Sequence, residues 1–403
     1  MPSAVAASTA ALGIRVGGSL GVGAGRARRR GAGSLGRAVD GVTLLDVGLV
    51  LDGKYEVCGV LGEGASGVVY DVRRLGDARS GGDERVALKV IHRHLMGNSQ
   101  LRGRFVREVA ILQRLKGKHL CPILESGELT DPRTSDGMLY MAIPKVDGPS
   151  LEKLVASSGP LPIERAIDIV LQICSALVDA HGQGIIHRDL KPANVLLRGG
   201  EHVVVVDFGM AKIVTGAGGT GTTDLTTHNM VFGTPEYMAP EQARGDELDA
   251  RCDVYAVGII LYELLSGKVP FHGASPLNVL TAHMTADLPP LARDVGPALH
   301  AVIHSALLKS PDERYANASD LARALEHALR APDDVDAVSP RLPRSHTVPL
   351  PSIPPQAGRA SAPSVPRGPA VDVRSGLAAS WILVWVLAIA TGIAVGVWLS
   401  LHT

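Results

Sequence analysis

The chain has 403 residues, 46% hydrophobic and 20% charged, which is enough for a sizeable core and for more than one folded part. Its 40 lysines and arginines balance 40 aspartates and glutamates, and this zero net charge argues against a nucleic-acid partner. The four cysteines are far apart in the sequence and form no CxxC pair, which argues against a disulfide framework or a zinc site.

The first 40 residues predict a disordered tail. Residues 1–39 contain nine glycines, nine alanines and six arginines, no acidic residue and no persistent apolar period. The cluster Arg26–Arg30 leaves other interpretations open: contact with nucleic acid or anionic lipid, an organelle transit peptide, or a stretch upstream of the true start. A solvated tail is the interpretation that the composition favours.

Residues 52–330 predict one folded domain whose two halves differ. The first half is rich in strands, predicted at Tyr55–Leu61, Val68–Arg73, Arg85–Ile91, Cys121–Gly127 and Leu139–Ile143. One clear helix interrupts them, at Leu101–Leu115. The second half is mainly helical, with helical spacing of apolar residues at 167–178, an all-round apolar helix at Val254–Leu265 and a closing helix at Ser319–Leu329.

A glycine-rich stretch, residues 62–69, lies between the first two predicted strands. Glycines let a backbone approach phosphates without Cβ clashes and leave its amides free to bind oxygen. The next strand places Lys89 among apolar residues, where a lysine is costly to bury unless it is paired, and Glu108 is the expected partner. Each of these features, taken alone, also has a purely structural interpretation. The glycines could form an ordinary turn, and Lys89 and Glu108 could be surface residues in contact with solvent.

The strongest signal is the segment Ile185–Asn194, which reads IIHRDLKPAN and is followed by VDFG at residues 206–209. It brings Asp189, Asn194 and Asp207 into two neighbouring loops, the second after a run of valines typical of a buried strand. Phosphoryl transfer needs a carboxylate to accept the proton of a hydroxyl group and further groups that hold a metal against phosphate oxygens.

The order of these motifs resembles that of bacterial eukaryotic-like (Hanks-type) Ser/Thr protein kinases over about residues 52–330. The resemblance implies an α+β, bilobal fold with a small β-rich N-lobe and a larger helical C-lobe. It implies phosphorylation of Ser/Thr hydroxyls on proteins, with ATP and Mg²⁺ as cofactors. Asp189 would orient the hydroxyl and accept its proton, Lys191 would neutralise the transferring phosphate, and Asn194 and Asp207 would hold the metal.

The same resemblance implies a nucleotide site in which Glu108 holds Lys89 against the phosphates. The implied site residues are Leu61, Gly62, Glu63, Gly64, Ala65, Ser66, Gly67, Val69, Ala87, Lys89, Glu108 and Leu196. The chain departs from the family pattern in the hinge, where Pro144 follows the gatekeeper Ile143 and stands in place of the usual acidic residue. That position offers adenine a carbonyl group, which proline retains, so we expect binding to persist with a stiffer hinge.

Residues 233–241 resemble the end of a kinase activation segment. Thr234 would lie near Asp189, Glu241 would pair with Arg314, and Asp253 would brace the backbone of the catalytic loop. His187 and Phe208 would pack internally. The threonines before Gly233 predict autophosphorylation, with Thr226 and Thr227 the best candidates and Arg188 the receptor for the new phosphate.

The sequence after residue 330 predicts a linker and a membrane anchor. Residues 331–375 contain ten prolines, and residues 377–401 form 25 consecutive residues without a charge. As a helix this span would be about 37 Å long, enough to cross a bilayer with some tilt. The arginines at 359, 367 and 374 precede it, so we expect a single-pass membrane protein with its kinase domain in the cytoplasm.

Two other functions are weighed against an active Ser/Thr kinase. One is a nucleotide-binding pseudokinase scaffold at the membrane, which the intact Lys89, Asp189, Asn194 and Asp207 disfavour. The other is a small-molecule kinase, which the segment 233–241 and its partner Arg314 disfavour. The substrates, the activating signal and a possible homodimer stay open.

Overall fold

The computed structural model describes seven stretches of the chain. They are residues 38–39, 42–64, 66–76, 84–92, 99–133, 137–208 and 234–340. By its internal contacts the chain divides into two units, Met1–Arg344 and Ser345–Thr403, and all of the described residues belong to the first. The statements below concern these residues.

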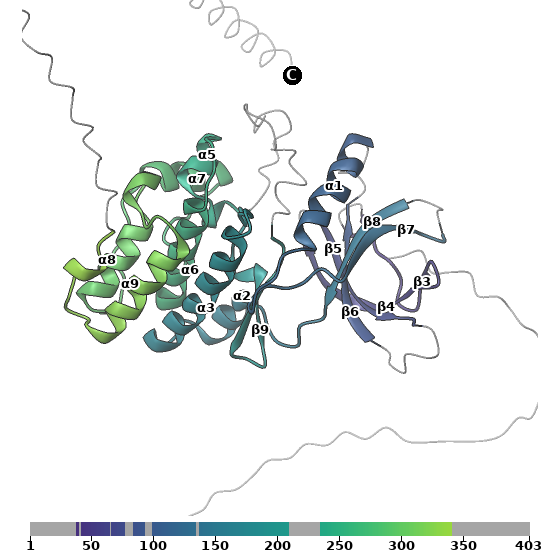
Figure 1. Cartoon of the computed structure of the whole chain (residues 1–403), viewed down its shortest axis with the longest axis horizontal. Coiled ribbons are helices and arrows are strands. Elements are labelled where there is room, and N and C mark those ends of the chain that lie inside the picture. Colours follow the sequence, from purple (N-terminus) through teal and green to yellow (C-terminus); the bar gives the residue numbers. More distant parts are fainter. Residues whose placement is uncertain are drawn as a thin grey trace, which may run out of the picture. The chain divides into compact units, whose positions relative to one another are not determined.

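A six-stranded antiparallel sheet forms the N-lobe, in the order β3-β4-β5-β6-β8-β7 (Figure 1). Its strands are β3 (Val50–Leu51), β4 (Tyr55–Gly64), β5 (Gly67–Arg74), β6 (Glu84–Ile91), β7 (Glu125–Thr130) and β8 (Gly137–Pro144). The helix α1 (Ser99–Leu112) accompanies the sheet, and the short strands β1 (Ala38–Val39) and β2 (Val42–Thr43) pair with each other. Along β5, Val68, Tyr70 and Val72 are buried while the residues between them are more exposed, which is the alternation of a strand with one core face.

The N-lobe core includes residues that precede the predicted domain boundary at residue 52. Leu45 and Leu51 are buried with Tyr70 and Val72 in one cluster. The guanidinium of Arg133 donates hydrogen bonds to the carbonyl of Leu44, at 3.3 Å, and to the carboxylate of Asp46, at 2.9 Å. The folded unit therefore includes residues before position 52, where the family resemblance begins, and tertiary contacts hold this segment in place.

The C-lobe is helical, as predicted. Its helices are α2 (Leu151–Ser158), α3 (Ile163–His181), α5 (Pro240–Arg244), α6 (Arg251–Ser266), α7 (Pro276–Thr285), α8 (Pro297–Ala306) and α9 (Ala318–Arg330). A small hairpin, β9 (Val195–Arg198) and β10 (His202–Val205), and the 3-10 turns η2 (Pro192–Asn194), η3 (Pro235–Tyr237), η4 (Pro311–Glu313) and η5 (Asp336–Val338) complete it. Helix α6 is buried nearly all round, as its apolar sequence predicts.

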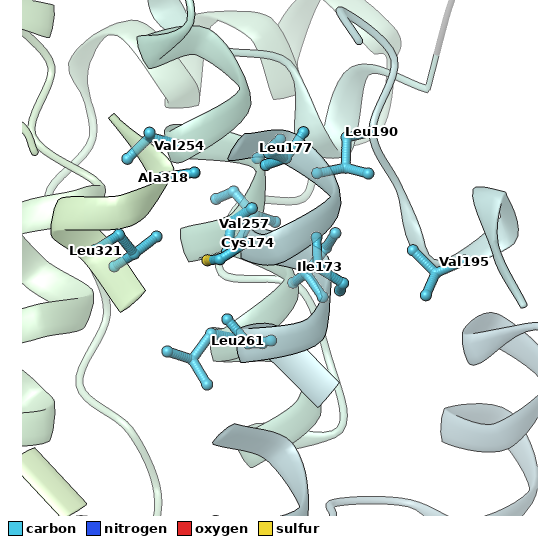
Figure 2. Close-up of a cluster of buried hydrophobic side chains, with 14 of the residues drawn as sticks. Ile173, Cys174, Leu177, Leu190, Val195, Val254, Val257, Leu261, Ala318 and Leu321 are labelled. Atoms are coloured by element: carbon cyan, nitrogen blue, oxygen red, sulfur yellow. The ribbon is translucent and has the colours of Figure 1, made fainter. Parts of the chain in front are cut away.

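The centre of the C-lobe core lies between α3, α6 and α9. Figure 2 shows Ile173 and Leu177 of α3 close to Val257 of α6, with Leu321 of α9 beside them. Each of these side chains is at most 1% exposed. Full burial of such a side chain contributes about 1.5–3 kcal/mol, so these contacts are a main source of the stability of the C-lobe.

Two further boundaries differ from the prediction in ways that tertiary contacts explain. The strand predicted at Cys121–Gly127 lies at Glu125–Thr130 instead, because Cys121 donates its backbone N–H to Val205 at the end of β10, at 3.0 Å. The linker predicted from residue 331 begins with packed chain, since Val338 is 1% exposed and its carbonyl accepts a hydrogen bond from the hydroxyl of Tyr315 at 2.5 Å.

The predicted membrane span at residues 377–401 lies outside the described residues, as do residues 1–37 of the predicted tail. Within the stretches that the structure describes, no helix combines the length and the apolar character needed to cross a bilayer.

Candidate active site

The side chains of Lys89 and Asp207 are in contact, although the two residues are 118 positions apart in the sequence. Lys89 lies on β6 with its side chain 8% exposed, and its Nζ is 2.6 Å from Oδ2 of Asp207, two residues beyond the end of β10. Asp207 has φ of 63°, a left-handed conformation that is uncommon for non-glycine residues, although aspartate adopts it more readily than most. Lys89 thus contacts the predicted metal ligand Asp207, and its predicted partner Glu108 lies half-buried on α1.

The catalytic loop gathers its polar groups around Asp189. The ammonium of Lys191 lies 3.0 Å from the carboxylate of Asp189 and donates a hydrogen bond to the hydroxyl of Thr234, also at 3.0 Å. The side-chain amide of Asn194 donates to the backbone carbonyl of Asp189 at 2.8 Å. The side chain of Asp189 is 28% exposed, so an incoming hydroxyl group can reach a carboxylate that its neighbours hold in place.

Asp253, at the start of α6, holds the catalytic loop through hydrogen bonds to its backbone. Its carboxylate accepts the backbone N–H groups of His187, at 2.8 Å, and Arg188, at 2.9 Å, and contacts Nε2 of His181 at 2.8 Å. Burial alone would raise the pKa of the Asp253 carboxyl, but the hydrogen bond and charge of His181, with those of His187, hold that pKa below its usual range. Arg188 has φ of 67°, and the bond from its N–H to Asp253 stabilises this uncommon conformation.

His187 packs inside the lobe, as predicted. It is fully buried, with Nε2 3.0 Å from the carbonyl of Val206 and its ring centroid 4.5 Å from that of Phe208. The contact joins the catalytic loop to the start of the segment after β10. Its role is therefore structural.

Glu241 and Arg314 form the predicted buried ion pair. Two parallel hydrogen bonds join the guanidinium to the carboxylate, at 2.7 and 2.8 Å, and both side chains are at most 4% exposed. Arg314 also donates to the carbonyls of Leu308, at 2.6 Å, and Lys309, at 3.1 Å. The pair is thus fully hydrogen-bonded, the condition under which a buried pair is tolerated.

Two functional contacts of the loop were missed from sequence. Gln242 donates its side-chain amide to the carbonyl of Arg188 at 2.8 Å and accepts the N–H of Ala239 at 3.0 Å, so it fastens the loop to α5. His181 adds the third contact to Asp253. The only sequence signal for Gln242 is its place in the first turn of α5, where glutamine often caps a helix.

The glycines at residues 62–67 have two separate uses in the hairpin of β4 and β5. A Cβ atom on Gly62 or Gly64 would meet nothing within 4 Å, so the backbone there is open to a ligand. A Cβ atom on Gly67 would lie 2.1 Å from the carbonyl oxygen of Val90, so this glycine allows β5 to approach β6 closely. Glu63 and Gly64 are exposed and Ser66 is half-buried, while Ala65 lies outside the described residues.

The residues expected around adenine come from both lobes. Val69 and Ala87 lie on neighbouring strands of the sheet, while Leu196 lies on β9, and Leu61 is 42% exposed on β4. Ala87 pairs with Ile143, and Val86 pairs with Pro144, the last residue of β8. The predicted gatekeeper and hinge therefore flank the strand that carries Lys89.

The donor groups fit Mg·ATP. Asp207 supplies a carboxylate, and Asn194 directs its amide nitrogen to Asp189, which leaves its amide oxygen as an acceptor. Such hard oxygen donors suit Mg²⁺, which commonly binds one or two protein side chains together with phosphate oxygens. The open backbone at Gly62 and Gly64, together with the ammonium of Lys89, suits the phosphates.

Several predicted residues of the activation segment lie outside the described residues, among them Thr226 and Thr227. Thr234 is described and contacts Lys191. Arg188, the predicted phosphate receptor, is held through its backbone by Asp253 and Gln242.

Comparison with known proteins gives a consistent result. A family model described as a protein kinase domain matches residues 55–329. The chain is 37% identical over 350 residues to the serine/threonine-protein kinase pkn3 of Myxococcus xanthus, a match that covers 83% of this chain and 59% of the relative. It is 38% identical over 288 residues to the serine/threonine-protein kinase PknB of Mycolicibacterium smegmatis, covering 70% of this chain and 44% of the relative. The chain thus spans about half the length of these curated relatives.

Proposed function

Because the chain belongs to the protein kinase family, we propose that it transfers a phosphoryl group from Mg·ATP to serine and threonine hydroxyls of proteins. The observation that carries the proposal is the contact of Lys191 with both Asp189 and Thr234, each at 3.0 Å. This contact places a proton acceptor and a cation together beside the segment that would receive a peptide.

Each residue of the site then has one task. Asp189 orients the substrate hydroxyl and accepts its proton, while Lys191 neutralises charge that develops on the transferring phosphoryl group. Lys89 and the open backbone at Gly62 and Gly64 hold the phosphates. Asn194 and Asp207 would hold Mg²⁺, which supplies neutralisation of phosphate charge when it is bound.

The test is phosphate transfer by the full-length protein. Purified chain in detergent is incubated with Mg·ATP and a generic basic protein, beside the Asp189→Asn variant. We expect incorporation into serine and threonine by the unmodified protein and a loss of at least about a hundredfold in the variant. Nucleotide binding without transfer would refute the proposal and support the pseudokinase scaffold.

Autophosphorylation at Thr226 and Thr227 is a further part of the proposal. The support is the anchored backbone of Arg188, which fixes the base of a cationic side chain next to Asp189. Mapping of phosphorylated sites in the unmodified protein and in Asp189→Asn decides it. Equal phosphorylation of both proteins would contradict autocatalysis.

Membrane attachment through residues 377–401, with the kinase domain in the cytoplasm, completes the proposal. Its support is the uncharged sequence of 25 residues and the arginines that precede it. Fractionation of cells that express the full chain should place it in the membrane fraction, and Leu387→Arg should release a large share of it. An unchanged distribution would count against a single central span.

A further inference from the structure

An ion-pair cluster lies at the hinge end of the N-lobe sheet. It comprises Asp71 on β5, Arg85 on β6 and Lys145, the first residue after β8. The carboxylate of Asp71 accepts a hydrogen bond from Nε of Arg85 at 2.9 Å and lies 3.2 Å from Nζ of Lys145. The side chain of Asp71 is 13% exposed and that of Lys145 is 29% exposed, so this pair is partly withdrawn from water.

The strand register places this cluster next to the nucleotide site. Val69 pairs with Lys89, and two residues further along β5 Asp71 pairs with Ala87, which in turn pairs with Ile143. Residues two apart on a strand share a face and lie about 7 Å apart, so Asp71 is on the face that carries Lys89, one step toward the hinge. The cluster therefore borders the region that Val69 and Ala87 offer to adenine.

The register also shows where the hinge begins. The last pair between β6 and β8 joins Val86 to Pro144, and the chain leaves the sheet at Lys145 on its way to α2. From that position Lys145 extends its side chain back past β6 to Asp71 on β5. Lys145, the first hinge residue outside the sheet, thus forms an ion pair with β5, although β6 lies between β5 and β8.

We propose that Asp71 is a positioning residue for the nucleotide: it holds Lys145, and with it the start of the hinge, against the N-lobe sheet. The carbonyl of Pro144, which the family resemblance assigns to adenine, immediately precedes the tied residue. Fixing Lys145 limits rotation of that carbonyl and reduces the ordering that nucleotide binding requires. The inference rests on the proposed nucleotide-binding function.

The cationic side chains of Arg85 and Lys145 explain why the ion pair between Asp71 and Lys145 is stable near neutral pH. Burial alone would raise the pKa of the Asp71 carboxyl, but the hydrogen bonds from Arg85 and Lys145 outweigh it and hold that pKa below its usual range. The carboxylate therefore stays charged. Loss of Lys145 would still leave the bond from Arg85 in place, so the substitution Lys145→Met removes the tie without leaving Asp71 alone.

The test combines kinetics with hydrogen exchange in the full-length protein. We expect Lys145→Met and Asp71→Asn each to raise KM for Mg·ATP about two- to fivefold, the effect of a partly exposed ion pair. The double variant should show no larger effect than either single one, kcat should stay within about twofold, and Lys145→Arg should restore KM. Without nucleotide, amide exchange at residues 145–148 should be faster in both single variants.

A matched control is the Glu56–Arg73 ion pair, which joins β4 to β5 without involving the hinge. Glu56→Gln should change neither KM nor exchange at the hinge. An increase of KM in Lys145→Met but not in Asp71→Asn would show that Lys145 contacts the nucleotide itself, and would overturn the proposal. Unchanged amide exchange at residues 145–148 in both variants would also overturn the proposal. This measurement does not require phosphate transfer, so it tests the role of Asp71 separately from the proposed kinase activity.

Discussion

Replacing Asp253 by asparagine should cost much of the stability of the C-lobe and nearly all activity. The carboxylate is 1% exposed and serves three nitrogen donors: one oxygen accepts the N–H of Arg188, and the other contacts the N–H of His187 and Nε2 of His181. Asparagine keeps the shape but turns one oxygen into an NH₂ group. The better orientation keeps its oxygen on the two histidine contacts and leaves the N–H of Arg188 facing another donor.

The magnitude follows from these contacts. An unsatisfied buried donor costs about 1–3 kcal/mol, and the two remaining bonds weaken because bonds to a charged acceptor are about twice as strong as neutral ones. The free energy of unfolding should therefore fall by about 3–5 kcal/mol. At about 2 °C per kcal/mol for a domain of this size, the melting temperature should fall by about 6–10 °C.

The effect on catalysis has a local cause. Arg188 has φ of 67° next to Asp189, and without its bond to Asp253 this conformation loses its main support. A displacement of about 1 Å at the reacting group can lower kcat about a hundredfold. Thermal unfolding and phosphate transfer measure the two effects, with Asp246→Asn as an exposed control. A melting temperature within 2 °C of the unmodified protein, or kcat within threefold, would refute this reasoning.

Three further predictions concern stability. Glu241→Gln should lower the free energy of unfolding by about 3–5 kcal/mol in urea, because it leaves the buried charge of Arg314 unpaired; a loss below 1 kcal/mol would contradict this. Burial lowers the pKa of His283 to about 4, so the unfolded chain binds this proton first as the pH falls below 6.5. The destabilisation caused by His283→Gln should therefore be about 2–3 kcal/mol smaller at pH 4.5 than at pH 7, and equal values would exclude a buried neutral imidazole. Gly67→Ala should lower the melting temperature well beyond Gly59→Ala, since only the former adds a Cβ atom against backbone; equal melting temperatures would show that the strands can separate.

Local patterns were sufficient for most of the fold and for the centre of the site. The apolar helix at residues 254–265 and the catalytic loop could be predicted because each depends on a short stretch of sequence. The Glu241–Arg314 pair and the bracing role of Asp253 came from the family resemblance, and the structure confirms both contacts. The start of β7 could not be predicted, since Cys121 donates its backbone N–H to the carbonyl of Val205 on a distant hairpin rather than to a neighbouring strand of the sheet.

The contact between Lys89 and Asp207 shows a second limit. The two residues are 118 positions apart, and sequence spacing alone does not predict that their side chains meet. The contact depends on the left-handed turn at Asp207, which is set by tertiary packing. Gln242 was missed for the same reason, because its target is a backbone carbonyl that has no signature in the sequence.

The contacts at the two ends of the folded unit decide how short a well-behaved fragment can be. A fragment limited to the family match, residues 55–329, would lack Leu45, Leu51 and Val338, which are at most 6% exposed. Their removal would expose the apolar surfaces that they now cover, and such patches promote self-association. A fragment of residues 44–340 retains all three side chains and the hydrogen bond from Arg133 to Leu44. Aggregation of the shorter fragment would therefore indicate the loss of these packed residues rather than a defective active site.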